Sequence, residues 1–419
     1  IYNYYNLTVV DSTFTNNSKD TIYNFRVANL DLGIKTFTDL QNAIGLVTGT
    51  LTLNQNVALT TKEAADFTNG ITINKDITID GKGHTIDAKN LGRIFSIGEG
   101  FTVTLTNATL INGKATEGGA IYNDGSLTLS DVKLSDNAAD SYGGAVFNNG
   151  ELVVSDSVFD SNYIVNRGSA SVDYGGAAIY NWYDGVLTVS GSNFTNNIKN
   201  YKNGDRLVGA ITTIGDATVS GSNFVNNSGR WGGALAATGG VSGSAINTIS
   251  VDGTKFVNNT ALYGGAMFVW ASNYTISNSV FDNNSAFGKG DMSPNNNNGG
   301  ALIVTQDNIP VSGKIVNSNF TNNKAQYGGA AWINEGTVDI DGSNFINNTA
   351  TTAAGAIGFD PQYAKIIATV DSSKFVNNTA GSYAGAIYNL GDLTVSGSEF
   401  DNNKAQFGDI IYNNKIYNK

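Results

Sequence analysis

Short stretches in which apolar and polar residues alternate recur along most of this chain, and each is followed by an aromatic anchor. Apolar pairs such as Leu152/Val154 and Leu393/Val395 stand seven and five residues before their anchors. Alternation at period two predicts a strand with one face against a core. The anchors are Phe159, Phe194, Phe224, Phe256, Phe281, Phe320, Phe345, Phe375 and Phe400, with Leu134 in the same place. Their spacing of 25 to 39 residues fits a unit of 25 with insertions.

Other residues keep fixed distances from the anchor. A small hydroxyl residue stands two residues before almost every anchor, an Asn stands three residues after it, and a Gly-Gly-Ala mark such as Gly143-Gly144-Ala145 follows. One such unit cannot bury its apolar face alone, but stacked units bury a continuous core. The repeat therefore predicts an all-β fold, a right-handed parallel β-helix (solenoid), with like residues stacked on like. Stacked Asn side chains are expected to pass hydrogen bonds from rung to rung.

The pattern breaks near the start of the chain. Phe37, Leu40, Ile44 and Val47 follow helical spacing within residues 34–48, and Thr38 with Gln41 has the form of a capping box. We expect a short N-terminal capping helix that covers the open first rung. The predicted organisation is 1–30, an N-terminal half-repeat; 31–70, a cap with a short helix and a first irregular strand; 71–413, the β-helix; and 414–419, a C-terminal tail.

The half-repeat before the cap has the standard offsets. It carries Leu7, Val9, Ser12, Phe14 and Asn17, whereas the last strand sequence, with Ile410, Ile411, Tyr412 and Asn413, has no Leu-x-Val…Phe stretch after it. One hypothesis is that residues 1–27 complete the C-terminal end of a neighbouring copy. That contact would propagate head to tail into a homopolymer. The alternative is that residues 1–27 are the tail of a preceding module in a longer chain.

Composition narrows the range of partners. The net charge is −11 with a pI near 4.5, so a nucleic-acid partner is not expected. The chain has no cysteine and no run of about 18 apolar residues, which excludes thiolate metal sites and a predicted membrane-spanning helix. No calcium loop of known spacing is present either. We therefore expect no metal and no cofactor.

Catalysis is not predicted. The best local cluster is Asp80, His84 and Asp87, but Asp80 belongs to an Asp-Gly turn that recurs elsewhere. Glycoside hydrolysis needs converging carboxylates. The carboxylates at repeat positions are expected to face outward without converging, and they are Asp156, Asp160, Asp282 and Asp401. The sequence thus predicts a protein that is not an enzyme.

Two kinds of surface contact are candidates. Trp182-Tyr183, an aromatic pair in a turn, could stack on a glycan, although local packing is the favoured interpretation. The recurring aromatics before the glycines, such as Tyr142 and Trp231, are likewise favoured as a structural ladder. N-glycosylation sequons occur at Asn6, Asn16, Asn107, Asn193, Asn226, Asn258, Asn273, Asn283, Asn319, Asn347 and Asn377, and the repeat itself generates several of them.

The combination of Gly-Gly-Ala-[Ile/Val/Leu] with Phe-x-x-Asn resembles the repeats of bacterial polymorphic outer-membrane proteins. The fuller form, and the segment Ile77-Thr-Ile-Asp-Gly-Lys-Gly-His-Thr-Ile86, is similar to adhesin-like surface proteins of methanogenic archaea. The resemblance covers roughly residues 70 to 413 and implies a secreted, surface-displayed, pectin-lyase-like β-helix.

These observations lead to an expected function with two alternatives. The expected protein is an extracellular cell-surface structural or adhesive protein that assembles head to tail into a filament or surface layer. The first alternative is an adhesin that binds surface glycans or a host through inserted loops. The second is a polysaccharide lyase or hydrolase.

Overall fold

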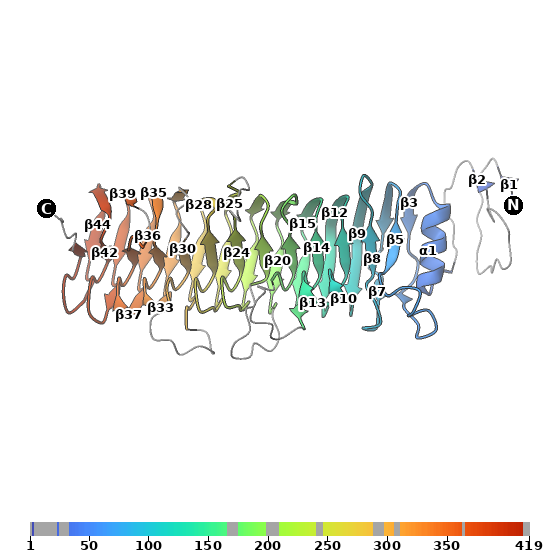
Figure 1. The fold of residues 1–419 in the computed structure, drawn as a ribbon, viewed down its shortest axis with the longest axis horizontal. Coiled ribbons are helices and arrows are strands. Elements are labelled where there is room, and N and C mark those ends of the chain that lie inside the picture. The colour runs from blue at the N-terminus through green and yellow to red at the C-terminus, as the bar shows by residue number, and fades with distance from the viewer. Residues whose placement is uncertain are drawn as a thin grey trace.

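The computed structural model describes residues 33–165, 175–197, 209–239, 246–287, 297–305, 311–362 and 365–413, together with the backbone of two short strands, β1 (Tyr2–Asn3) and β2 (Tyr23–Asn24). The chain winds into an elongated parallel β-solenoid whose successive turns lie side by side, with α1 at one end and β45 at the other (Figure 1). The predicted fold class is confirmed. The domain boundaries stay predictions, since the Leu7–Asn17 half-repeat lies outside the described residues.

One face of the solenoid, face 1, is a 13-stranded parallel sheet built from the strands that follow the Gly-Gly-Ala marks. Its strands in spatial order are β5 (Ile71–Ile73), β8 (Phe95–Ile97), β11 (Ile121–Asn123), β14 (Val146–Asn148), β18 (Ile179–Asn181), β21 (Ile211–Thr213), β24 (Leu235–Thr238), β27 (Met267–Trp270), β30 (Leu302–Thr305), β34 (Ala331–Ile333), β38 (Ile357–Phe359), β42 (Ile387–Asn389) and β45 (Ile411–Asn413).

The apolar pairs and the anchors form two further faces that meet at a bend. Face 2, with the apolar pairs, contains β3 (Gly49–Thr52), β6 (Ile77–Asp80), β15 (Glu151–Ser155), β19 (Val186–Ser190), β22 (Ala217–Ser220), β25 (Thr248–Asp252), β28 (Asn273–Ser277), β31 (Ser312–Val316), β35 (Gly336–Asp341), β39 (Ile366–Asp371) and β43 (Asp392–Ser396). Face 3, with the anchors, contains β4 (Val57–Ala58), β7 (Thr85–Asp87), β16 (Val158–Asp160), β20 (Asn193–Thr195), β23 (Asn223–Val225), β26 (Lys255–Val257), β29 (Val280–Asp282), β32 (Asn319–Thr321), β36 (Asn344–Ile346), β40 (Lys374–Val376) and β44 (Glu399–Asp401). The long strands β9 (Thr102–Ile111) and β12 (Ser126–Ser135) run through both faces.

Two short sheets lie between face 3 and face 1 along the chain. One contains β10 (Lys114–Glu117), β13 (Ala138–Tyr142) and β17 (Tyr163–Ile164), and the other contains β33 (Lys324–Tyr327), β37 (Thr349–Ala353) and β41 (Thr379–Ala380). All described pairings are parallel, and equivalent repeat positions pair with each other, as Phe159 does with Phe194. Register is therefore set by the repeat itself, because a slip by one residue would turn the apolar set outward.

The core is a set of stacked columns. The anchor rings from Phe159 to Phe400 stack on their neighbours with centroids 4.5 to 5.0 Å apart. Every ring in this stack is fully buried except that of Phe400 in the last rung. Each stacked aromatic pair contributes roughly 0.5–1.5 kcal/mol beyond its buried area.

The Asn that follows each anchor forms a buried ladder, as predicted. The Asn259 side chain donates from Nδ2 to Asn284 Oδ1 at 3.0 Å and to the Phe224 carbonyl at 2.9 Å. Its backbone N–H donates to the same Asn284 Oδ1 at 3.0 Å. The pattern repeats from Asn137 to Asn403, so the turn after face 3 leaves few buried polar groups unpaired.

A second ladder runs along the bend between faces 2 and 3. The hydroxyl of Ser192 accepts from the Ser157 backbone N–H at 3.0 Å and donates to the Ser190 carbonyl at 2.8 Å. Equivalent bonds join the small hydroxyl residues as far as Ser398. The hydroxyl two residues before each anchor therefore pairs the backbone N–H and carbonyl groups that are buried at this tight bend.

The helix α1 (Phe37–Leu46) covers the first rung through Phe37, Leu40, Ala43 and Ile44. The helix is confirmed, but the predicted capping box of Thr38 and Gln41 is wrong. The N-cap is Thr36, whose side chain accepts from the Asp39 N–H at 3.2 Å. The Gln41 side chain instead donates to the Thr72 carbonyl and accepts from the Thr72 N–H, which fastens the helix to β5.

We predict that Asn284→Ala lowers the free energy of unfolding by about 2–5 kcal/mol, because Asn259 loses its acceptor and the Phe256 carbonyl loses its donor. Guanidinium denaturation followed by circular dichroism measures the loss. The neighbouring Asn283 is exposed with φ of 52°, so Asn283→Gly should stay within about 0.5 kcal/mol. Equal losses in both variants would contradict the ladder's role.

We also predict that acid loosens the cap. Burial alone would raise the pKa of Glu63, but hydrogen bonds from Thr38 and Thr60 outweigh it and lower the pKa to about 2. A pKa below the unfolded value of about 4.3 stabilises the cap above that pH, and the contribution is lost as the pH falls toward 2. Hydrogen exchange at the Thr38 amide should therefore quicken across this range. In Glu63→Gln the exchange should already be fast at neutral pH, whereas Asp66→Asn should match the parent.

Candidate functional site

At the bend between faces 2 and 3, the backbone adopts a left-handed conformation that few residue types favour. Asn107, Asp131 and Asp156 occupy the same place in successive rungs and have φ values of 50°, 56° and 48°. Asn and Asp tolerate this left-handed conformation better than other non-glycine residues. Later rungs use Gly191 and Gly221 at this place. The conformation explains why Asn, Asp and Gly recur there, and it directs short polar side chains outward.

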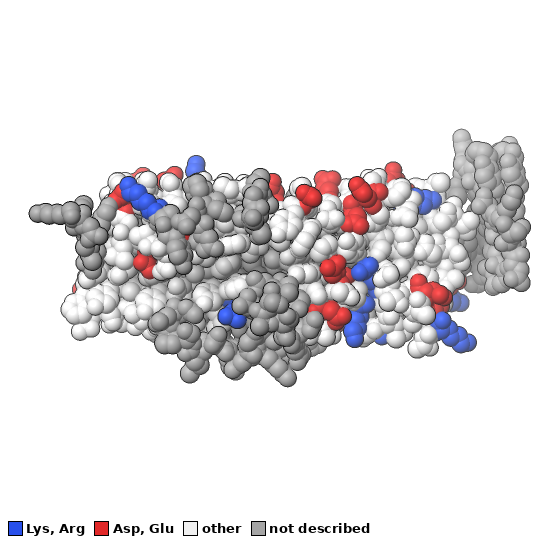
Figure 2. Space-filling model, in the orientation of Figure 1, with Lys and Arg blue, Asp and Glu red and all other residues white. Residues whose placement is uncertain are grey.

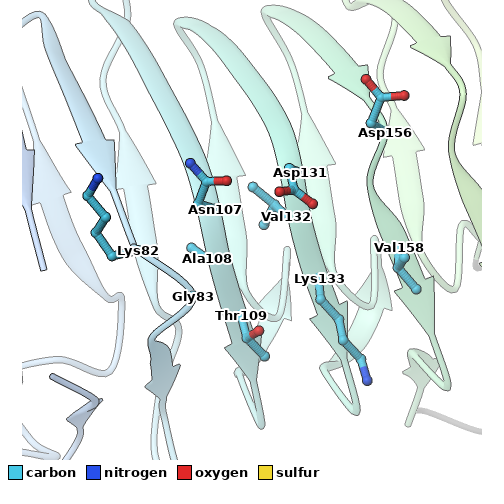
Figure 3. A pocket seen from close by; sticks show the side chains of 10 residues that line it. All are labelled: Lys82, Gly83, Asn107, Ala108, Thr109, Asp131, Val132, Lys133, Asp156 and Val158. Carbon is cyan, nitrogen blue, oxygen red and sulfur yellow. The ribbon is translucent and has the colours of Figure 1, made fainter. Parts of the chain in front are cut away.

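A cavity of about 450 Å³ opens at this bend over the early rungs (Figure 3). Its lining residues are Lys82, Gly83, Asn107, Ala108, Thr109, Asp131, Val132, Lys133, Asp156 and Val158. They come from the turn after β6 and from β9, β12 and the β15–β16 bend. The lining thus combines two cations, two carboxylates, an amide and a hydroxyl with small apolar groups.

The polar groups of this cavity differ from outward polar groups elsewhere on the solenoid. The Asp160 carboxylate accepts from Thr195 Oγ1 at 2.7 Å and from Asn196 Nδ2 at 3.1 Å. Asp282 binds Thr321 and Asn322 in the same way. Across the described ranges, no hydrogen bond or ion pair engages the side chains of Asp131, Asp156 or Lys133. These groups are therefore available to a ligand.

The register places Asp131 and Asp156 in one column. Ser130 pairs with Ser155, and Lys133 pairs with Val158, so Asp131 and Asp156 lie in adjacent rungs of one column. Adjacent strands of a sheet are about 4.8 Å apart. The expectation that Asp156 faces outward without a converging carboxylate stays a prediction, because a shared column fixes the spacing of the two backbones and not the direction of the two side chains. The sequence did contain a signal for the shared column, because Asp131 and Asp156 are 25 residues apart, which is one uninterrupted unit.

The cluster of Asp80, His84 and Asp87 does not form a site. Asp80 accepts from the Lys82 backbone N–H and Asn107, and Asp87 accepts from Lys89 and Asn112. Burial alone would raise the pKa of each carboxyl, but these hydrogen bonds, with the nearby lysine ammonium groups, lower both pKa values below the usual range. Each carboxylate is therefore held ionised by its own turn. No group of three potential metal ligands occurs among the residues that the structure describes.

Trp182 and Tyr183 belong to a larger aromatic cluster on the outer side of face 1. The Trp182 ring lies 5.7 Å from Tyr180, 6.0 Å from Phe147 and 6.1 Å from Tyr142, measured between centroids. Tyr183 meets Trp182 edge-on at 4.8 Å and is 38% exposed. The pair is thus packed as part of the aromatic ladder, and its contact with a glycan stays a prediction.

The described sequons divide by burial. Asn193, Asn273 and Asn319 are half-buried, whereas the exposed ones are Asn107, Asn226, Asn258, Asn283, Asn347 and Asn377. Five of these exposed residues, from Asn226 onward, share one column of positive φ. The left-handed backbone conformation favours Asn at this position, and these Asn residues are the ones that form the sequons. Their glycosylation stays a prediction. Asn6 and Asn16 lie outside the described residues.

The residues predicted to exchange between subunits are described only at the C-terminal end. Ile411, Tyr412 and Asn413 form β45 and pair with β42, and Ile410 precedes them with 47% of its surface exposed. Leu7, Val9, Ser12, Phe14 and Asn17 lie outside the described residues. Most of the inserted loops proposed to bind partners do so as well.

Charge and hydropathy add two observations. On the face shown in Figure 2, acidic and basic side chains lie close together in several places and uncharged residues cover much of the surface. Within the described part of the chain, no helix is long and apolar enough to cross a membrane.

Comparisons with known proteins show the fold. No protein-family model and no curated protein matches the sequence. The structure is similar to tailspike protein 3 of bacteriophage CBA120, with a TM-score of 0.51 and 10% identity, over 90% of this chain and 56% of the tailspike. It is also similar to the catalytic unit of a thermostable GH87 α-1,3-glucanase from Streptomyces thermodiastaticus, with a TM-score of 0.47 and 14% identity, over 92% of this chain and 71% of that chain. The likeness shows a β-solenoid and nothing finer, so the adhesin-like, archaeal character stays a prediction.

These comparisons contradict the prediction that the chain is not an enzyme. They show a solenoid fold shared with a phage tailspike, and a fold does not decide whether a protein is an enzyme. The fold and its regular repeat therefore give no reason to exclude catalysis. The absence of a local catalytic motif was also a weak argument, because a solenoid assembles its sites from residues in successive rungs.

Proposed function

We propose that this chain is an extracellular, surface-displayed β-helix that binds a glycan in the cavity between Lys82 and Asp156. The observation that carries the proposal is that no described residue engages the charged side chains of Asp131, Lys133 and Asp156 in that cavity, whereas Asp160 and Asp282 are paired between rungs. Carboxylate, ammonium and amide groups together can bind sugar hydroxyls as acceptors and donors. Small apolar side chains such as Val132 and Val158 supply contact area.

The shape of the cavity fits the same ligand class. It lies at the bend and is lined by residues of four adjacent rungs (Figure 3). A linear glycan laid along the solenoid would meet these groups one rung at a time.

The test begins with a glycan array, followed by calorimetry with a glycan that binds. We predict that Lys133→Ala and Asp131→Asn each weaken binding at least tenfold, since a charge-assisted hydrogen bond contributes about 1.5–3 kcal/mol. Lys255→Ala is the matched control, because Lys255 has the same position in a later rung outside the cavity. If Trp182→Ala abolishes binding while Lys133→Ala does not, the aromatic cluster binds the glycan and the cavity assignment is wrong.

The cavity also favours a second candidate function, hydrolysis of the bound glycan. Retaining glycosidases hold two carboxyl groups about 5–5.5 Å apart, one as acid and base and one as nucleophile. The backbones of Asp131 and Asp156 lie in adjacent rungs, about one strand spacing apart, and this spacing allows their carboxyl groups to reach a separation of that order.

We predict that Asp131→Asn and Asp156→Asn each reduce the release of reducing ends by about 10²–10⁴-fold. Asn keeps the left-handed backbone at both positions, so folding should be preserved. Asp160→Asn removes a carboxylate of the same rung that is engaged by Thr195 and Asn196, and its activity should match the parent. A bound glycan that yields no reducing ends would contradict hydrolysis while leaving the binding proposal intact.

A further inference from the structure

The outer surface of face 2 carries two neighbouring columns of hydroxyl side chains, which together we call the hydroxyl array. Both columns alternate with the buried apolar positions of the strands, so their side chains lie on the outward side of the sheet. The first column contains, in successive rungs, Thr50, Thr78, Thr104, Thr128, Val153, Thr188, Thr218, Ser250 and Thr275. The second column, two residues further along each strand, contains Thr52, Asp80, Thr106, Ser130, Ser155, Ser190, Ser220, Asp252 and Ser277.

The array is regular in two directions. Neighbouring rungs lie about 4.8 Å apart, and residues two apart in one strand lie about 6.6 Å apart. The strand register is unbroken from β3 to β28, so these spacings are kept from Thr50 to Thr275. A β-branched side chain such as Thr is stiff at χ1, which gives each hydroxyl and methyl group a defined position.

The centre of the array is uncharged and open. From Thr104 to Ser220, the two columns contain hydroxyl residues and a single valine, Val153. All of these side chains are half-buried or exposed. Among the described residues, the only hydrogen bonds from these central side chains are contacts of 3.5 Å from Ser190 and Ser220 to backbone carbonyls. The central threonine hydroxyls therefore face the solvent, unlike the buried hydroxyls at the bend.

The solenoid itself does not require hydroxyl groups at these positions. Lys314 and Asp339 occupy the first column in the two rungs that follow Thr275, and their strands pair in the same register. Valine, isoleucine and tyrosine also suit an outward strand position. The long run of threonine in the earlier rungs is therefore a property of the surface and not of the fold, and it points to a ligand that binds hydroxyl groups.

The spacing of the array restricts the kind of ligand. Each hydroxyl both donates and accepts a hydrogen bond, and the uncharged centre has no group that would select an ion or a charged polymer. A dissolved polymer repeats along one direction, whereas the array repeats along two. The surface of an ice crystal repeats in two directions at similar spacings, and each of its water molecules donates and accepts. Because the array is already ordered, many weak hydrogen bonds can form at a small entropic cost.

We propose that the hydroxyl array binds the surface of ice crystals. The threonine hydroxyl groups replace water molecules of the crystal surface, and the threonine methyl groups lie between neighbouring water molecules. The array shares no residue with the lining of the glycan cavity. Ice binding is therefore separate from the proposed function and does not depend on it.

The test grows ice slowly from a solution of the full-length chain and measures how much protein enters the ice. The parent should concentrate in the ice and slow its recrystallisation. The double variant Thr128→Lys with Thr188→Lys should lower the incorporation about tenfold, because two bulky charged side chains hold the crystal surface away. Lys314 shows that this column accepts a lysine, so the circular dichroism should not change.

The matched control is Thr369→Lys, which makes the same substitution in the same column, in a later rung outside the array. Its incorporation should equal that of the parent. Exclusion of the parent from ice, or equal incorporation of the parent and the double variant, would overturn the proposal. Microcrystalline cellulose is the second probe. Binding of the parent to cellulose without incorporation into ice would assign the array to a crystalline polysaccharide and would also overturn it.

Discussion

The hydrogen bond from each ladder Asn to the next is the interaction on which this solenoid depends. A tight turn buries backbone N–H and carbonyl groups that strand pairing does not reach. The Oδ1 of each ladder Asn, such as Asn259, accepts from the backbone N–H and the Nδ2 of the preceding ladder Asn. Its Nδ2 donates to the carbonyl of the anchor in the preceding rung and to the Oδ1 of the next ladder Asn. Because each Asn pairs the polar groups of its neighbour, the ladder couples successive rungs at a turn that strand pairing does not reach.

That constraint also explains where the chain can vary. The ladder positions and the stacked rings fix three points of each rung, and the residues between them face outward or form turns. Intervals between anchors range from 25 to 39 residues, yet every described bond from one ladder Asn to the Oδ1 of the next has a length of 2.9 to 3.2 Å. Insertions are therefore absorbed outside the ladder, and outward positions can change without disturbing the core.

The sequence predicted those features of the fold that recur at the same position in every rung. The strands, the stacked Phe rings and both ladders follow from offsets that can be counted in the sequence. It was less informative where a property depends on two neighbours in space. Thr36 rather than Thr38 caps α1 because Asp39 completes the capping box. The availability of Asp131 and Asp156 depends on the absence of a Thr or Asn at the right place in the next rung, where Asp160 has both. A repeat pattern shows which residues share a column, but not which of them bind one another.

The one-way direction of the ladders has an evolutionary consequence. A segment that runs from one ladder Asn to the next carries one complete acceptor and one complete donor, whatever the length of its turns. Duplication or loss of such a segment leaves the flanking rungs able to bond to each other directly. The length of this rod can therefore change in whole rungs, by recombination between copies of the repeat, without any compensating substitution in the core.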